Sequence, residues 1–368
     1  MKYLLSKIAT LYDWELITLV FAINIIGFMA IYSASQNYGT ESYFYLKQIG
    51  WFFIGLVFMS IICMISFNWI MRFAYLSHLG VIFLLVLTLT YGGGNKYSDV
   101  NRWLDLGFIY LQPSEFAKFT LVLALAAYFK DTQKIGSLRW HDLLITGTMT
   151  LVPVALIFRQ PDFGTAAVLL IIYAVTIFMM GLNYKVIFSS LFLGVLFTPL
   201  GWNLLKPYQQ DRIISMFDPE SDPLGKGYHL IQSKIAIGSG GISGKGFLEG
   251  KQAQLNFLPA KHTDFIFSLF SEEWGFMGSM FLLALYYAFL IKCISFVKKS
   301  GSKTGAVICT GITTIFFTHI LVNVSMVMGL MPVVGIPLPF FSYGGSSMLS
   351  MMLGIGLALN SLRNSRYY

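Results

Sequence analysis

Long apolar runs recur along the whole chain, and short polar stretches separate them. A helix of about 20 apolar residues spans the roughly 30 Å hydrocarbon core of a bilayer. The pattern therefore predicts about ten transmembrane helices, with approximate centres in residues 15–34, 48–66, 73–91, 113–129, 142–158, 163–181, 186–202, 266–291, 305–328 and 345–362. The runs lack the alternation of barrel strands, so the sequence predicts an all-α integral membrane protein.

Composition and charge agree with this class. Of the 368 residues, 56% are hydrophobic and 11% are charged, whereas soluble domains carry about 25% charged residues. Lys and Arg are concentrated in the short loops of one side, which places both termini in the cytoplasm under the positive-inside rule. The stretch 203–265 is then a long extracytoplasmic loop. Anionic lipid head groups explain the net charge of +8, so no nucleic acid partner is expected.

The chain is predicted to form a single multi-pass membrane domain over residues 1–368, because no linker rich in Pro, Ser or charge divides it. The first apolar run is too long for the core of a cleavable signal, so we expect it to remain as the first span. Cys63, Cys293 and Cys309 have no metal-ligand spacing, and we interpret them as packing residues.

Polar residues in or beside the apolar runs are functional candidates, because a charge at the centre of a membrane helix costs about 2.5–3.5 kcal/mol on insertion scales. Under the predicted topology, several polar groups fall on the outer side of the membrane, which indicates one site. They are the groups around Arg102, Glu115, Asp162 and Asp264 and the turn that precedes Ser342.

Two pairs of opposite charges are each three residues apart. Glu115 and Lys118 open an apolar run and share a helix face, so they can form an ion pair. Asp162 follows Arg159 at the same spacing, and a similar pair is expected there. For both pairs, a purely structural role is an equal alternative to a functional one.

Two further segments cannot be ordinary spans. Residues 331–347 contain three prolines and three glycines, and irregular backbone at membrane depth is tolerated where it lines a cavity; simple turn packing is the alternative. Residues 238–246 are rich in glycine but fail the nucleotide-loop pattern. An anion-binding backbone nest and a flexible loop or re-entrant turn both remain open for this run. His262 and His319 have no ligands at metal spacing, so no protein metal cage is predicted.

These segments together resemble the SEDS family of shape, elongation, division and sporulation proteins. The resemblance runs in the same order from about residue 15 to 362, and it includes His-Thr-Asp-Phe-Ile-Phe at 262–267. The other matching runs are at residues 101–103, 112–118, 160–165, 227–233, 235–241 and 337–347. The short termini and the run 227–241 resemble the elongation branch, typified by RodA, more than the division branch. Ala260 departs from the usual Glu, and Phe163 departs from the common Leu.

The resemblance implies a peptidoglycan glycosyltransferase that polymerises lipid II on the outer face of the bacterial plasma membrane during cell elongation. It also implies a class B penicillin-binding protein, a transpeptidase, as partner, and it assigns the catalytic role to Asp264. A lipid-linked precursor flippase and a non-catalytic scaffold of the cell-wall synthesis complex are the alternatives. A protein of either alternative class would not depend on Asp264 as a catalytic group for sugar transfer.

Polymerisation from a lipid pyrophosphate requires one base and cationic groups for the phosphates, because pyrophosphate leaves without a second carboxylic acid. Asp264 fits the base. The expected substrate-binding residues are Arg102, Arg159, Arg212, Lys261 and His262. The expected supporting polar residues are Glu115, Lys118, Asp162 and Ser342. The expected cofactor is a divalent cation held with the pyrophosphate, with no organic cofactor.

Overall fold

The computed structural model describes residues 12–36, 43–93, 101–105, 107, 110–130, 138–182, 207–222, 227–255, 257–258 and 260–365. The described part is a helical bundle with one antiparallel pair of short strands, β1 (Leu104–Asp105) and β2 (Tyr110–Leu111). The helices of the first half are α2 (Trp14–Ser35), α3 (Phe44–Met64), α4 (Phe67–Arg72), α5 (Ala74–Tyr91), α6 (Pro113–Lys130), α7 (Trp140–Arg159) and α8 (Phe163–Met179). Those of the second half are α11 (Pro207–Phe217), η2 (Pro219–Ser221), α12 (Tyr228–Ser239), α13 (Lys251–Gln254), α14 (Ile266–Lys299), α15 (Lys303–Val327) and α16 (Gly345–Ser365).

The prediction of an all-α membrane protein is confirmed. Nine of the ten expected runs form helices, and the tenth, 186–202, lies outside the described residues. Seven of the described helices are long and apolar enough to cross a bilayer. α8 is apolar but shorter, and α6 contains three charged residues.

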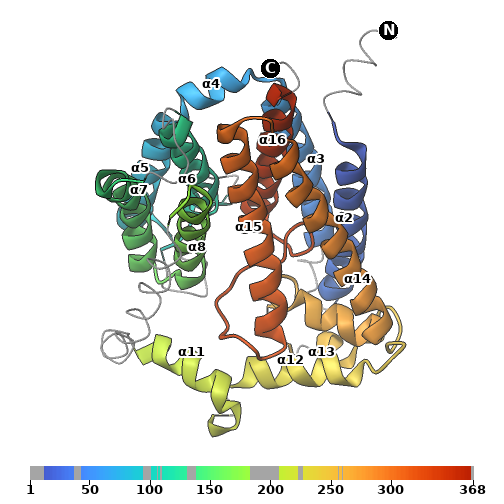
Figure 1. The fold of residues 1–368 in the computed structure, drawn as a ribbon. Coiled ribbons are helices and arrows are strands. Elements are labelled where there is room, and N and C mark those ends of the chain that lie inside the picture. Colours follow the sequence, from blue (N-terminus) through green and yellow to red (C-terminus); the bar gives the residue numbers. More distant parts are fainter. Residues whose placement is uncertain are drawn as a thin grey trace, which may run out of the picture.

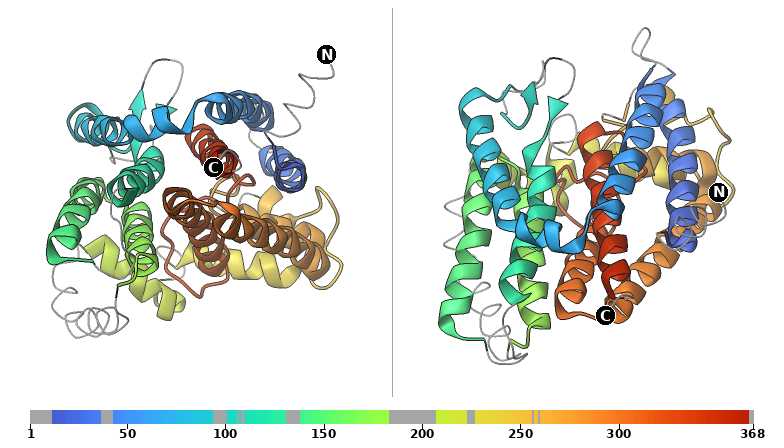
Figure 2. Two further views of the ribbon diagram at one scale, coloured as in Figure 1. Left: turned by 45° about the horizontal axis from the view of Figure 1, so that its top comes forward. Right: turned by 90° about the horizontal axis from the view of Figure 1, so that it is seen from above.

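The long helices run side by side, and α15 and α16 occupy the interior of the bundle (Figures 1 and 2). These two helices are also the most buried of the candidate spans. α11, α12 and α13 lie across one end of the bundle (Figure 1), so the predicted long loop contains helices of its own. α12 is attached through Ser233, whose Oγ donates to the Val327 carbonyl at 2.6 Å and lies 2.7 Å from Ser268 Oγ.

The run expected as one span at 266–291 is broken inside α14. Gly275 has φ 64° and ψ −161°, a conformation open to glycine. Residues 240–246, which we call the glycine loop, pack against this break. The Lys245 and Gly246 amides donate to the Glu272 and Glu273 carbonyls at 3.1 and 3.0 Å. These amides are therefore occupied, and the glycine-rich run serves as a packed turn.

Two further features of the bundle lie apart from the turn that contains Asp264. The three cysteines are buried and unpaired, as packing residues are.

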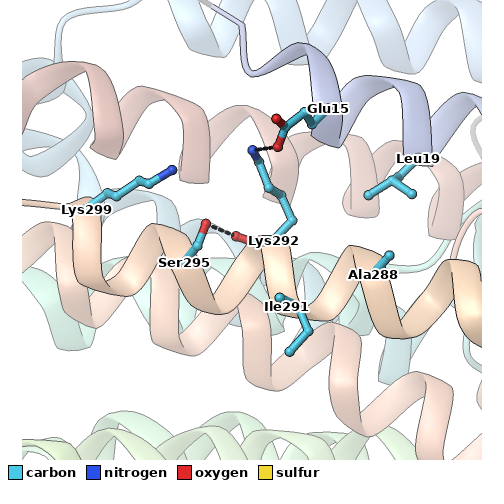
Figure 3. Close-up of a pocket in the computed structure, with 7 residues that line it drawn as sticks. All are labelled: Glu15, Leu19, Ala288, Ile291, Lys292, Ser295 and Lys299. Carbon is cyan, nitrogen blue, oxygen red and sulfur yellow. Dashed lines mark hydrogen bonds and ion pairs between the residues drawn. The ribbon is translucent and has the colours of Figure 1, made fainter.

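A cavity of about 400 Å³ opens between the start of α2 and the second half of α14, beside the Lys292–Glu15 ion pair (Figure 3). Its lining residues on α14 lie between Ala288 and Lys299, beyond the break at Gly275, so the cavity is separate from the site described next.

Candidate active site around Asp264

Asp264 lies in a tight turn immediately before α14. This turn, residues 260–265, begins at Ala260, whose φ of 45° lies in the left-handed region. The Ala260 carbonyl accepts hydrogen bonds from the amides of Thr263 at 3.0 Å and Phe265 at 3.4 Å. Ala260 thus serves the turn through its backbone. We call residues 260–265 the Asp264 turn.

The Asp264 side chain is half-buried, and its charge is influenced from several elements. Burial raises the pKa of this carboxyl to about 6, and the charge of Asp162 also raises it, whereas Arg212 and Arg102 lower it. No residue in the described part of the chain donates a hydrogen bond to the carboxylate. Asp264 is therefore ionised at pH 7 and still has its oxygen lone pairs available.

The Asp264 turn is held through its backbone by the proline-rich segment, residues 331–344. The Ser342 hydroxyl donates to the Thr263 carbonyl at 2.7 Å, and the Tyr343 amide donates to the His262 carbonyl at 2.9 Å. A Cβ placed at Gly335, which has φ +73°, would lie 3.5 Å from Asp264 Oδ2. The irregular segment therefore forms a wall beside Asp264, and Ser342 supports the site by anchoring this turn.

Gln48 of α3 fixes the other side of the proline-rich segment. Its side-chain amide donates to the Ser342 carbonyl at 3.1 Å and its oxygen accepts from the Gly344 amide at 3.1 Å. Our sequence reasoning missed Gln48, although a polar amide near the start of an apolar run was a signal that pointed to it.

Glu115 and Lys118 form a buried ion pair in α6, with 3.0 Å between Oε2 and Nζ. Lys118 Nζ also lies 2.8 Å from Nε2 of His319, whose Nδ1 lies 3.0 Å from the Pro337 carbonyl. Because an ammonium only donates, Nε2 accepts and Nδ1 carries the proton that is donated to Pro337. The pair thus supports the proline-rich segment through His319, a residue that the sequence had left without a role.

Asp162 caps α8 and does not pair with Arg159. Its carboxylate accepts from the Thr165 hydroxyl at 2.9 Å and the Ser114 hydroxyl at 3.4 Å. Arg159 is exposed in the last turn of α7, and the described residues give it no ion pair. The expected Arg159–Asp162 pair is wrong because the chain reverses between the two residues, at Pro161, where φ is 30°.

Arg102 braces this reversal. Its guanidinium donates from Nε to the Gln160 carbonyl at 3.0 Å and from Nη2 to the Pro161 carbonyl. The same side chain is one of the two arginines that lower the pKa of Asp264. Arg102 therefore holds the α7–α8 turn and also supplies a positive charge that acts on the Asp264 carboxylate.

The remaining predicted residues differ in their surroundings. Lys261 is 1% exposed, and burial lowers its pKa to about 8. The His262 ring stacks on Phe44 with 4.8 Å between centroids, and burial and Lys261 lower its pKa to about 4. Lys261 is therefore mostly charged at pH 7, whereas His262 is neutral and held in an aromatic stack.

Arg212 of α11 reaches the site from the layer across the end of the bundle. It lowers the pKa of Asp264, and it also lowers the pKa of His229, whose ring stacks on Phe265 at 6.2 Å. Of the predicted phosphate-binding residues, the structure thus gathers Arg102, Arg212 and Lys261 at the Asp264 turn and leaves Arg159 outside it.

This arrangement defines a multi-pass membrane protein in which several cations act on or lie beside the carboxylate of Asp264. The model of the FtsW, RodA and SpoVE family, described as cell cycle proteins, matches residues 13–367. The chain belongs to this family, which confirms the SEDS resemblance.

Individual relatives are similar to this protein over most of the chain. Peptidoglycan glycosyltransferase MrdB of Escherichia coli strain K12 is 37% identical, covering 95% of this chain and 92% of the relative. A chain from a study of how a peptidoglycan synthase complex coordinates polymerization and crosslinking has a TM-score of 0.82 at 32% identity, covering 96% of this chain and 98% of that one. Rod shape determining protein RodA of Thermus thermophilus has a TM-score of 0.72 at 28% identity, covering 97% and 98%.

Proposed function

We propose that this chain is a peptidoglycan glycosyltransferase that polymerises lipid II with Asp264 as its general base. The class follows from family membership and from relatives named peptidoglycan glycosyltransferase. The observation that carries the base assignment is the Asp264 carboxylate: its turn is held through the backbone, burial raises its pKa to about 6, and the charges of two arginines act on it. A base with a pKa just below the working pH is ionised and still accepts a proton effectively.

In the proposed reaction, the oxygen of an acceptor sugar hydroxyl attacks the anomeric carbon of the donor. The new glycosidic bond forms as the bond to the lipid pyrophosphate breaks, and that electron pair leaves with the pyrophosphate. The hydroxyl proton passes to an Asp264 carboxylate oxygen. Arg102, Arg212 and Lys261 offset the negative charge that develops on the leaving group.

We further propose that a divalent cation accompanies the pyrophosphate. Among the described residues, no group of three or more His, Cys, Asp or Glu side chains could hold a metal ion. The Asp162 carboxylate is already occupied by hydroxyl donors. The cation would therefore be held mainly by phosphate oxygens, as Mg²⁺ commonly is. Chelation should lower turnover while leaving the melting temperature of the protein unchanged.

The proposed setting is the bacterial plasma membrane, with the site on the outer face and both termini in the cytoplasm. The distribution of Lys and Arg supports this orientation. The proposed partner is a class B penicillin-binding protein, in keeping with the similar chain from a complex that coordinates polymerization and crosslinking. An elongation role is supported by similarity to a rod shape determining protein.

Turnover of lipid II by the purified chain, with and without the transpeptidase, tests the function directly. We expect glycan strands from the wild type and polymerisation about 10²- to 10⁴-fold slower from Asp264→Asn under the same conditions. A flippase would instead move lipid II across vesicles without forming glycan, and a scaffold would do neither. Either result would refute the proposal.

Orientation has a separate test, because the three native cysteines are buried and give little background. An impermeant thiol reagent applied to intact cells should label Glu249→Cys, which lies in the exposed stretch before α13. It should label Lys298→Cys, at the end of α14, only after permeabilisation. The reverse pattern would invert the topology.

A further inference from the structure

One buried amide contacts the Asp264 turn and has no part in the chemistry described above. Asn323 of α15 is 0% exposed, and its Nδ2 donates to the Asp264 carbonyl at 3.1 Å and the Ile336 carbonyl at 2.8 Å. Its Oδ1 finds no donor among the described residues. Because both neighbours are acceptors, only the amide nitrogen satisfies them, which fixes the orientation of the side chain.

We propose that Asn323 is a positioning residue for the base: it joins the Asp264 turn to the proline-rich segment and so fixes where the carboxylate meets the acceptor hydroxyl. This inference rests on the proposed function of Asp264. Asn323 touches the backbone of the base, and no reacting atom is assigned to it.

The attachment is rigid because α15 holds the proline-rich segment at two consecutive carbonyls. His319, one turn before Asn323, bonds the Pro337 carbonyl at 3.0 Å, while Asn323 bonds that of Ile336. His319 is in turn held by Lys118 at 2.8 Å. The buried pair in α6 therefore fixes the segment, and Asn323 transmits that position to Asp264.

Loss of the amide has a specific consequence. The Asp264 and Ile336 carbonyls would lose their shared donor, and two acceptors that remain close repel each other or admit water. A displacement of about 1 Å at a reacting group can lower the rate about 100-fold. Water at the turn would also remove part of the burial that raises the pKa of Asp264 to about 6.

The other charged and titratable groups around the turn would remain in place. Arg102 of the strand region, Arg212 of α11 and Asp162 at the start of α8 act on the charge of Asp264. Lys261 and His262 belong to the turn, and His229 of α12 stacks on Phe265 of the turn. Of these, Arg102 and Arg212 lower the pKa of Asp264, so a hydrated Asp264 should titrate near its ordinary value. The acid side of the rate profile then reports directly on the surroundings of the turn.

The test compares Asn323→Ala with Asn360→Ala. Asn360 is a matched control: it is buried in α16, and its amide also donates to two carbonyls, those of Ile62 and Ile65, both at 2.7 Å. These carbonyls lie at the opposite end of α3 from Gln48, away from Asp264. Each variant loses two hydrogen bonds from a membrane helix, but only the Asn323 side chain contacts the Asp264 turn.

We expect Asn323→Ala to lower kcat about 10- to 100-fold with little change in KM and to move the acid limb of the rate profile below pH 6. Asn360→Ala should keep the wild-type limb and kcat per folded molecule. Asn323→Ser has a hydroxyl that can donate to one of the two carbonyls, so it should give an intermediate rate. This variant keeps the test decisive if the alanine variant does not fold.

Equal effects of the Asn323 and Asn360 variants, or a lower rate with an unmoved acid limb, would overturn the positioning role. Asp264→Asn separates this outcome from failure of the proposed function. If Asp264→Asn remains active, the base assignment fails whatever Asn323 does. If Asp264→Asn is inactive and Asn323→Ala behaves as the control does, only the positioning role fails.

Discussion

The two ends of the first segment of α14 surround the carboxylates of Glu272 and Asp264 in opposite ways. At the α14 break, Glu272 accepts from Lys245 Nζ at 2.6 Å and from the Gln252 amide at 3.1 Å. Glu273 accepts from the Leu248 amide at 3.3 Å and from the Ser33 hydroxyl. At the other end, the Asp264 carboxylate receives no hydrogen bond from any described residue, although its backbone is held.

This difference separates a structural acid from a reactive one. Direct donors occupy the lone pairs of Glu272, so the group ties the glycine loop to α14. Asp264 is stabilised only by more distant charges, which leaves its oxygens available for a proton from the substrate. The protein fixes the position of Asp264 through the carbonyls of the turn.

Substitution of Asp264 should have the largest effect, and it distinguishes the role of Asp264 from that of Glu272. Asp264→Asn keeps the shape and removes the base, so polymerisation should fall about 10²- to 10⁴-fold. Above pH 6 the wild type carries a charge that burial disfavours, so the melting temperature of this variant should not fall at pH 7.5. Lipid II turnover and thermal unfolding on the same samples measure both quantities.

Glu272→Gln should show the opposite behaviour. It leaves Lys245 without its carboxylate and should destabilise the fold by about 1–3 kcal/mol, while turnover per folded molecule stays near wild type. A loss of turnover without a loss of stability in this variant would show that the break, too, has a catalytic role.

The buried pair in α6 can be tested with a double-mutant cycle. Glu115→Ala leaves Lys118 as an uncompensated buried charge and should destabilise the protein by about 3–5 kcal/mol. Adding Lys118→Ala should cost little more, because residues of one pair are not additive. Unfolding of the two single variants and the double variant measures the coupling. Independent losses would mean that the pair does not support the proline-rich segment as a unit.

The smallest effect is the pH dependence of the wild type. The pKa of Asp264 is about 6 and that of Lys261 about 8. kcat/KM should fall below pH 6 as the base gains a proton and fall above pH 8 as the ammonium loses one. Lys261→Arg should remove the alkaline limb, because guanidinium stays charged. An alkaline limb that persists in this variant would exclude Lys261 from phosphate binding.

The raised pKa of Asp264 also affects the stability of the folded protein in a defined direction. The folded protein binds a proton at Asp264 more tightly than the unfolded chain does, because the folded pKa of about 6 lies above the ordinary value of 3.8. The contribution of this group to stability is therefore greatest below pH 3.8 and is lost as the pH rises through 6.

Several features of the site were accessible from residue spacing. Glu115 and Lys118 share a helix face, and the structure shows that pair. Three prolines excluded a helix in the segment beside Asp264. Arg159 shows the limit of such reasoning, because the spacing that favours a pair on a continuous helix fails when the chain reverses at Pro161.

The sequence by itself determined the helical bundle, since apolar runs of bilayer length have one solution for their backbone hydrogen bonds. It also determined Asp264 as the residue of interest, through a run of residues that resembles a known family. Gln48, His319 and Asn323 acquired their roles only in the tertiary structure. Each is a polar residue within a largely apolar run, and each contacts a backbone carbonyl of a distant segment, up to 294 residues away. Only the packing of α3, α15 and the proline-rich segment brings those groups within hydrogen-bond distance, so no local pattern could have predicted these contacts.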